Sequence, residues 1–134
     1  MDDSISELLR LTALNKSTLP KLTLSVDGSK LDVFLKDILY MEQNLRNFSI
    51  YFYNGDVITA TGSISQQESY CSSFNFLRSH KSYLVNLAYV TVVHKDLLVF
   101  EMCNGSNVYI RRGSFVSAKH AFESYLFEHA RSFL

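Results

Sequence analysis

Hydrophobic and polar residues alternate along much of the chain after Pro20, a pattern that is typical of half-buried β-strands. Every second residue from 22 to 26 is apolar, and after a turn the alternation resumes over residues 31–35. Further short strands are predicted over residues 38–41, 48–53, 57–60, 83–86, 90–93, 97–102 and 107–111. Turn-forming residues separate these segments at intervals of about 8–12 residues, which favours an antiparallel β core.

Two Asn-Gly pairs predict tight hairpins, because this dipeptide suits the backbone of the commonest two-residue turns. Asn54-Gly55 joins the segments at 48–53 and 57–60, and Asn104-Gly105 joins the last two predicted strands. The polar residues 43–47 separate two other strands and are expected to form a loop.

Three segments have helical spacing instead. Residues 4–15 open with Ser4 and Glu7 at the spacing of a capping box, and residues 63–70 have the same spacing at Ser65 and Glu68. The third segment presents one apolar helical face, which consists of Phe115, Ala118, Phe122, Tyr125, Leu126 and Phe133. The expected fold is therefore β-rich, with a helix at each end and one inserted.

Length and composition set the domain organisation. The chain has 134 residues, of which 47% are hydrophobic and 19% charged, so one domain with a sizeable core is expected and disorder is excluded. We expect residues 1–20 to form an N-terminal helix and linker, and residues 21–134 to form the domain. The N-terminus lacks a secretory signal, and no apolar run approaches the ~20 residues that cross a bilayer. With two cysteines, Cys71 and Cys103, we expect a cytoplasmic protein with reduced thiols and no membrane partner.

Candidate catalytic and metal sites are weak. His80 and Ser82 would share a face of a strand, but no orienting acid, nucleophile elbow, phosphate loop or zinc motif accompanies them. His120 and His129 are separated by roughly 13 Å of helix rise, which is too far to share an ion. We therefore expect no enzyme activity, no cofactor and no metal.

The distribution of charge changes what the total charge suggests. Thirteen basic residues balance thirteen acidic ones, and a neutral total argues against nucleic acid as a partner. However, residues 1–77 contain six basic and nine acidic residues, whereas residues 78–120 contain six basic and two acidic. A local basic face can bind phosphates whatever the total charge is, because screening limits each charge to roughly 10 Å.

Three sequence blocks resemble a known family. Residues 76–86, FLRSHKSYLVN, match the pattern F-x-R-x-H-x-S-x-hydrophobic-V-N of the LytTR family, the DNA-binding domain of LytR/AlgR-type response regulators. Upstream, residues 37–42 (DILYME) resemble the family's D-I-L-Y-I-E strand, and residues 108–112 (VYIRR) stand where the family has an I-P-V-S-R-like segment. The resemblance covers about residues 20–127.

The resemblance implies a mostly β fold of small stacked antiparallel sheets, in which loops enter successive major grooves of DNA. It also implies three contact loops in this chain. The first contains Asn44, Arg46 and Asn47; the second contains Lys81 and Ser82, with Arg78 and His80 beside them; and the third contains Arg112, with Arg111 and Ser114. Arg78 and His80 either contact DNA or brace their loop. Tyr109-Ile110-Arg111 departs from the family's usual Pro-Val-Ser, so the third loop is expected to differ in shape.

The leading hypothesis is a transcriptional regulator that binds double-stranded DNA sequence-specifically, as two copies on paired repeats that can associate as a homodimer. Because the twenty residues before the domain are too few to hold a receiver domain, we expect this chain to lack one, either as a fragment of a longer regulator or as a free-standing member. The alternative is a protein-interaction or dimerisation module that keeps the fold without binding DNA, as the neutral total charge and the two amphipathic helices suggest. A third option is a single-strand binder, in which aromatics of residues 48–53 stack on bases.

Overall fold

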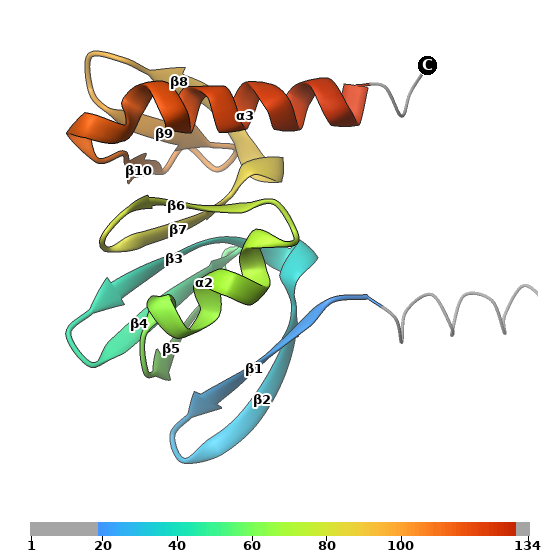
Figure 1. Cartoon of the computed structure of the whole chain (residues 1–134). Coiled ribbons are helices and arrows are strands. Elements are labelled where there is room, and N and C mark those ends of the chain that lie inside the picture. The colour runs from blue at the N-terminus through green and yellow to red at the C-terminus, as the bar shows by residue number, and fades with distance from the viewer. Residues whose placement is uncertain (1–18, 131–134) are drawn as a thin grey trace, which may run out of the picture.

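The structure is a computed structural model that describes residues 19–130, in which three small antiparallel sheets are stacked one above another (Figure 1). The strands are β1 (Lys21–Val26), β2 (Ser29–Phe34), β3 (Ile38–Asn44), β4 (Asn47–Phe52), β5 (Val57–Thr61), β6 (Phe76–His80), β7 (Tyr83–Asn86), β8 (Val90–His94), β9 (Val99–Met102) and β10 (Asn107–Tyr109). The helices are α2 (Ile64–Ser72) and α3 (Phe115–Ala130), with 3-10 turns η1 (Leu35–Asp37), η2 (Leu87–Tyr89) and η3 (Arg112–Ser114). The expected mostly β fold with a C-terminal helix is confirmed.

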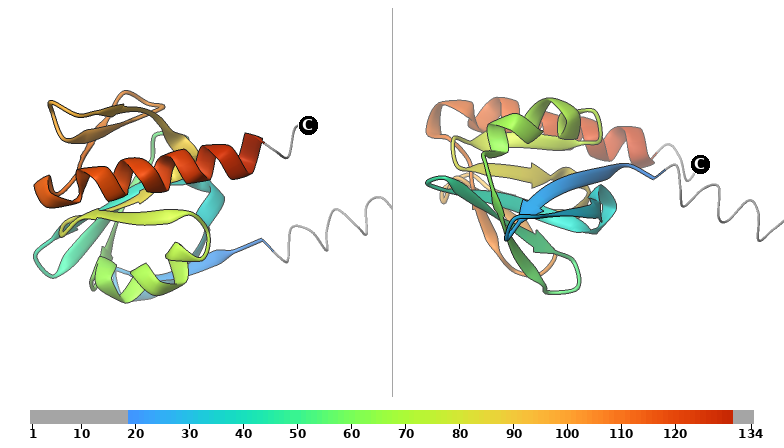
Figure 2. Two further views of the ribbon diagram at one scale, coloured as in Figure 1. Left: turned by 45° about the horizontal axis from the view of Figure 1, so that its top comes forward. Right: turned by 90° about the horizontal axis from the view of Figure 1, so that it is seen from below.

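The five-stranded sheet is the middle layer. Its strand order is β5-β4-β3-β7-β6, with the β1–β2 hairpin on one side and the three-stranded sheet β10-β9-β8 on the other. Both helices lie on the same side of the molecule, in front of the strands in Figure 1 and above them in the right-hand view of Figure 2. Neither α2 nor α3 is long and apolar enough to span a membrane.

Two hydrophobic cores cover the two faces of the middle sheet, and β3 contributes to both. Ile38 and Met41 belong to the core shared with β1, β2 and α2, whereas Leu39 and Tyr40 belong to the core shared with the three-stranded sheet and α3. All four side chains are buried because both faces of the strand are covered. A β-bulge between Ile38 and Tyr40 shifts the alternation by one residue, so that two consecutive side chains reach the same core.

The Asn-Gly hairpins occur where the sequence predicts them, since β4 pairs with β5 and β9 with β10. Two expectations are wrong. The segment 43–47 is no loop, because β3 extends to Asn44 and β4 begins at Asn47, which leaves a two-residue turn. The N-cap of α2 is Ser63, whose capping box uses Gln66 rather than the predicted Ser65 and Glu68.

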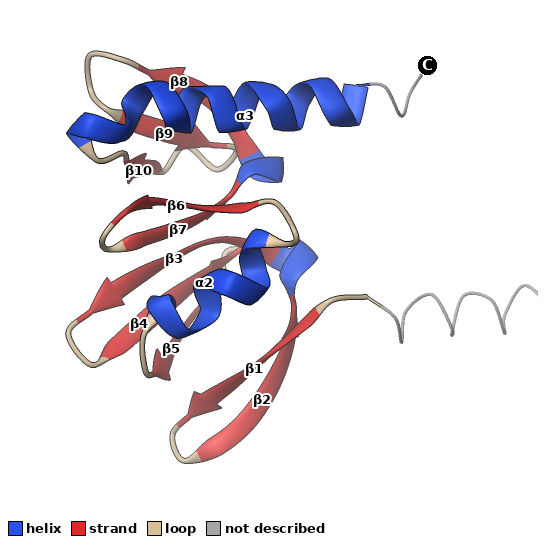
Figure 3. Cartoon of the chain, in the orientation of Figure 1, coloured by secondary structure: helices blue, strands red, loops and turns tan. Residues whose placement is uncertain are grey.

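Strand β6 is not predicted by the sequence pattern (Figure 3). A bulge between Arg78 and His80 interrupts its alternation and buries the polar Ser79. On α3, Ala118 and Phe122 are buried as expected, but Leu126 is 48% exposed. The predicted helix at residues 4–15 lies outside the described residues, as does Phe133.

Candidate nucleic-acid interface

Three connections project from the same side of the molecule, at the left in Figures 1 and 3 and in both views of Figure 2. They are the β3–β4 turn, the β6–β7 turn and the segment from β10 into α3, which hold the three groups of predicted contact residues. Backbone hydrogen bonds tie them together. The Gln43 N–H donates to the Ser82 carbonyl at 2.8 Å, and the Arg111 N–H donates to the Ser79 carbonyl at 2.7 Å. The spacing of the three connections is therefore fixed by the fold.

The first connection is the turn Leu45–Arg46, flanked by the paired residues Asn44 and Asn47. Arg46 is exposed, and its carbonyl accepts from the Gly62 N–H at 2.9 Å. The Asn44 amide nitrogen lies 3.1 Å from the Ser49 hydroxyl. Among the contacts of residues 19–130, no hydrogen bond or ion pair occupies the side chain of Arg46 or Asn47.

The side chain of Gln43 contacts the backbone of this turn, a role that the sequence does not indicate. Its Nε2 lies 2.8 Å from the Leu45 carbonyl, 3.0 Å from that of Asn47 and 3.1 Å from that of Gly62. Its Oε1 accepts from the Ile64 N–H at 2.8 Å, at the start of α2. One side chain therefore links the turn to the β5–α2 connection.

Arg78 lies in β6, and its half-buried guanidinium contacts α2 and the β6–β7 turn. Its Nη1 donates to Glu68 at 2.7 Å and to the Ser65 hydroxyl at 3.1 Å, and its Nε donates to the His80 carbonyl at 3.0 Å. Its Nη2 also donates to the Lys81 carbonyl. All three guanidinium nitrogens thus hold the β6–β7 turn and anchor it to α2.

His80 and Ser82 close the same turn. The His80 Nδ1 accepts from the Ser82 N–H at 3.1 Å, and the imidazole packs edge-on against Tyr83 with ring centroids 5.8 Å apart. Lys81 is exposed at the tip, and no contact within the described chain occupies its amine. Hydrogen bonds therefore hold the backbone of the turn, and its tip carries a lysine that is free within the described chain.

The third connection follows β10. Arg111 and Arg112 are exposed and Ser114 is half-buried, immediately before α3 begins. An open groove of about 370 Å³ separates this segment from the second connection, and its lining residues are Arg78, Ser79, His80, Lys81, Arg111 and Ser114. The Ser79 hydroxyl donates to the Tyr109 carbonyl at 2.8 Å and so fixes one wall of the groove.

The electrostatic character of this side is positive. Arg46, Lys81, Arg111 and Arg112 have no carboxylate partner among residues 19–130, whereas the Glu68 carboxylate is paired with Arg78. Four unpaired cations within three adjoining connections form the kind of surface that attracts phosphates.

A tyrosine cluster lies directly behind the connections. The Glu42 carboxylate accepts from the Tyr51 hydroxyl at 3.1 Å and from the Tyr83 hydroxyl at 2.8 Å, and Tyr40 stacks on Tyr51 with ring centroids 4.4 Å apart. Burial, and then the hydrogen bond to Glu42, raise the pKa of Tyr83 above its usual range. Although Glu42 belongs to the recognised DILYME block, sequence reasoning missed its role as a hydrogen-bonding centre for three strands.

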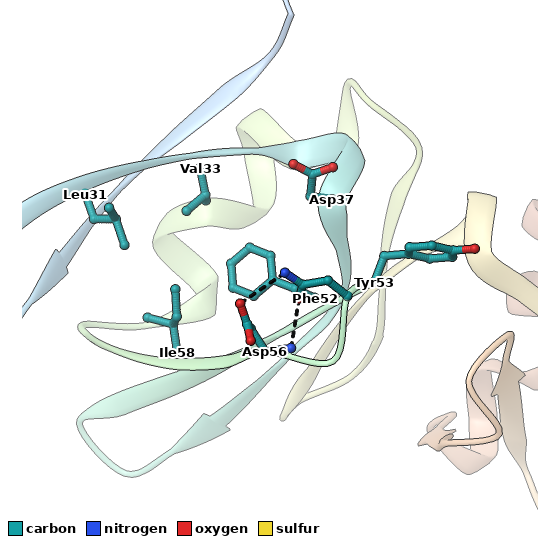
Figure 4. A pocket seen from close by; sticks show the side chains of 8 residues that line it. Leu31, Val33, Asp37, Phe52, Tyr53, Asp56 and Ile58 are labelled. Carbon is teal, nitrogen blue, oxygen red and sulfur yellow. Dashed lines mark hydrogen bonds between the residues drawn. The ribbon is translucent and has the colours of Figure 1, made fainter.

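A second cavity lies at the Phe52 end of β4, away from the β3–β4 turn (Figure 4). It has a volume of about 420 Å³ and an apolar floor that includes Val33, Phe52 and Ile58. Asp37 and Asp56 line its rim, and their charges would repel a phosphate. Within residues 19–130 no three His, Cys, Asp or Glu side chains are grouped so as to hold a metal ion.

Of the four aromatic side chains in residues 48–53, three are covered by other parts of the protein. The rings of Phe48 and Phe52 are buried, and Tyr51 is covered by Tyr40. Tyr53 is 65% exposed and packs against Tyr89 with ring centroids 5.4 Å apart, so the segment offers one exposed ring rather than a row of rings on which successive bases could stack.

Comparison with known proteins agrees with this arrangement. A LytTr DNA-binding domain from Bacillus cereus superposes with a TM-score of 0.62 at 20% sequence identity, covering 76% of this chain and 94% of that one. No curated protein matches the chain. Residues 29–123, which include all three connections, match the family of LytTr DNA-binding domains. The chain therefore belongs to the LytTr DNA-binding domain family.

Proposed function

We propose that this domain binds double-stranded DNA sequence-specifically and regulates transcription, with its three connections entering successive major grooves on one face of the duplex. The observation that carries the proposal is the set of four unpaired cations, Arg46, Lys81, Arg111 and Arg112, on one side of a LytTr fold. Braced turns present these side chains without the loop-ordering cost that flexible segments add to binding.

The residues have different proposed roles. Arg112 reads a guanine edge with a bidentate contact, which is worth about 1–3 kcal/mol of discrimination. Arg111, Asn44 and Asn47 supply further base or sugar contacts. Arg46, Lys81, Ser82 and Ser114 hold phosphates and fix the register of the domain. Arg78 and His80 position Lys81 through the hydrogen bonds they make within the protein.

Selection from a pool of random duplexes, followed by a mobility-shift assay, tests the proposal. We expect a sequence motif to be enriched. Log affinity should fall with log salt at a slope of about −2 from the two cations proposed to hold phosphates, Arg46 and Lys81. Arg112→Ala should reduce discrimination, whereas Lys81→Ala should weaken all duplexes alike. Lys36→Ala removes a charge from η1, at the opposite end of the sheet in Figure 1, and is the matched control.

Failure to enrich any motif, with a clean dimer in solution, would favour the protein-interaction alternative instead. We further propose that two copies occupy paired repeats. Sedimentation of the domain with duplexes that contain one or two copies of the enriched motif measures this directly. Binding of two domains to the two-copy duplex supports the arrangement, and a single bound domain on both duplexes contradicts it.

A further inference from the structure

Leu45 is an unusual residue for the tip of a hairpin. Its side chain is 97% exposed, and its backbone has φ of 58°, in the left-handed region that disfavours residues other than Gly, Asn and Asp. Within residues 19–130, Leu98 is the other residue with positive φ that is not Gly, Asn or Asp. Leu98 is half-buried, whereas Leu45 is exposed. No packing offsets the strain at Leu45.

The strained turn is held in place by its surroundings. Gln43 reaches the carbonyls of Leu45 and Asn47, and the Gly62 N–H donates to the Arg46 carbonyl at 2.9 Å. Strained backbone persists where neighbouring structure over-determines it, and such residues concentrate at functional sites. The fold therefore holds the backbone that carries this exposed apolar side chain in one place.

The neighbours of Leu45 indicate what this side chain meets. Arg46 and Asn47 have free polar side chains at the same tip. The turn lies beside the β6–β7 turn, to which the hydrogen bond from the Gln43 N–H to the Ser82 carbonyl ties it. An apolar group that enters a major groove among polar contacts finds one apolar feature on the base edges, the 5-methyl group of thymine.

We infer that Leu45 contacts a thymine 5-methyl group in the major groove and so adds a specificity contact to the first connection. This inference rests on the proposed function, because it requires that the β3–β4 turn enters the groove. The contact buries one methyl group against the leucine, and burial of a methyl-sized group changes affinity by about fourfold.

Deoxyuridine lacks only the 5-methyl group of thymidine, so it tests the contact atom by atom. Each thymidine of the duplex enriched by selection is replaced in turn, and affinities are measured by fluorescence anisotropy for wild type, Leu45→Ala and Leu126→Ala. Leu126 is an exposed leucine on the far part of α3, so Leu126→Ala controls for deletion of apolar surface. We expect at least one replacement to weaken wild type and Leu126→Ala about fourfold and to leave Leu45→Ala unchanged.

The inference is overturned if no replacement weakens wild type, or if Leu45→Ala keeps the same sensitivity as wild type. If Leu45 instead inserted between stacked bases, Leu45→Ala would keep the sensitivity of wild type to deoxyuridine. Both failures leave sequence-specific binding of wild type intact, so they are distinguishable from failure of the proposed function, in which no duplex is enriched and both proposals fall. Leu45→Gly adds a second measurement, because relief of the strain should raise Tm by about 2–5 °C while affinity falls.

Discussion

Gln43→Ala is expected to loosen the β3–β4 turn, because it removes the side chain that lies within hydrogen-bonding distance of three carbonyls and one N–H. Two of these contacts, to the Gly62 carbonyl and from the Ile64 N–H, are partly buried and should contribute about 1 kcal/mol each. The two contacts to the Leu45 and Asn47 carbonyls are exposed, and water can replace them at lower cost. The expected loss is about 2–3 kcal/mol of unfolding free energy.

A loss of this size should lower Tm by about 10 °C for a domain of this length. DNA affinity should also fall. If the freed turn relaxes from about 1 kcal/mol of strain at Leu45, the binding-competent turn is populated about one time in six, which weakens affinity about sixfold.

Thermal unfolding followed by circular dichroism, and anisotropy with the enriched duplex, measure the two effects. Gln67→Ala is the matched control, since Gln67 lies on the neighbouring helix α2 and no contact within the described residues occupies its side chain. Gln43→Glu keeps the size of the side chain but replaces the donor by an acceptor, so it should destabilise at least as much as alanine. If Gln43→Ala and Gln67→Ala melt within about 2 °C of each other, the turn is held by something other than Gln43.

Three further predictions follow from other contacts. Arg78→Lys should lower Tm by several degrees and weaken DNA binding with an unchanged sequence preference, because one amine cannot replace three guanidinium nitrogens; an altered preference in the selection assay would instead indicate direct contact. At neutral pH one thiol per folded chain, Cys103, should react with Ellman's reagent, because burial raises the pKa of Cys71 to about 12; reaction of both thiols would contradict this. Glu42→Gln should lower the pKa of Tyr83 toward its usual value, so that tyrosinate absorbance begins at lower pH than in wild type. Because the pKa of Tyr83 is raised in the folded state, the free energy of unfolding of wild type should be unaffected by this tyrosine below the pKa of unfolded tyrosine and should decline as pH rises above it.

The sequence predicts the parts of this fold in which local chemistry and packing agree. Alternation identifies β1 and β2, and each Asn-Gly pair marks a hairpin that the structure contains. The β3–β4 turn has no such marker. Its residues are Leu45 and Arg46, and its conformation depends on Gln43 and on backbone groups of Gly62 and Ile64, about twenty residues away in the chain. A contact of that range leaves no periodic pattern, so residues 43–47 read as a polar loop.

Strand β6 illustrates a second limit. Its sequence is FLRSH, in which an arginine, a serine and a histidine follow one another where a half-buried strand would alternate apolar and polar residues. The bulge resolves this, because Ser79 turns inward and donates to the Tyr109 carbonyl while Arg78 reaches across to α2. The serine hydroxyl is buried only because a neighbouring strand supplies its acceptor, which cannot be inferred from β6 alone.

The same strand shows why family membership predicts DNA binding but not a target. The pattern that identifies the family specifies Arg78, His80 and Ser82, and in this chain each of these takes part in hydrogen bonds that hold the turn. The pattern leaves position 81 open, and Lys81 there is exposed and unoccupied within the described chain. Leu45 and Arg46 likewise lie outside every recognised block. Arg78 and His80 therefore build the frame of the turn, whereas Lys81, Leu45 and Arg46 can change without loss of that frame. Arg112 lies in a recognised block, so the guanine contact proposed for it can be common to family members, whereas contacts from positions 45, 46 and 81 are expected to differ between them. A target sequence must consequently be measured for each member.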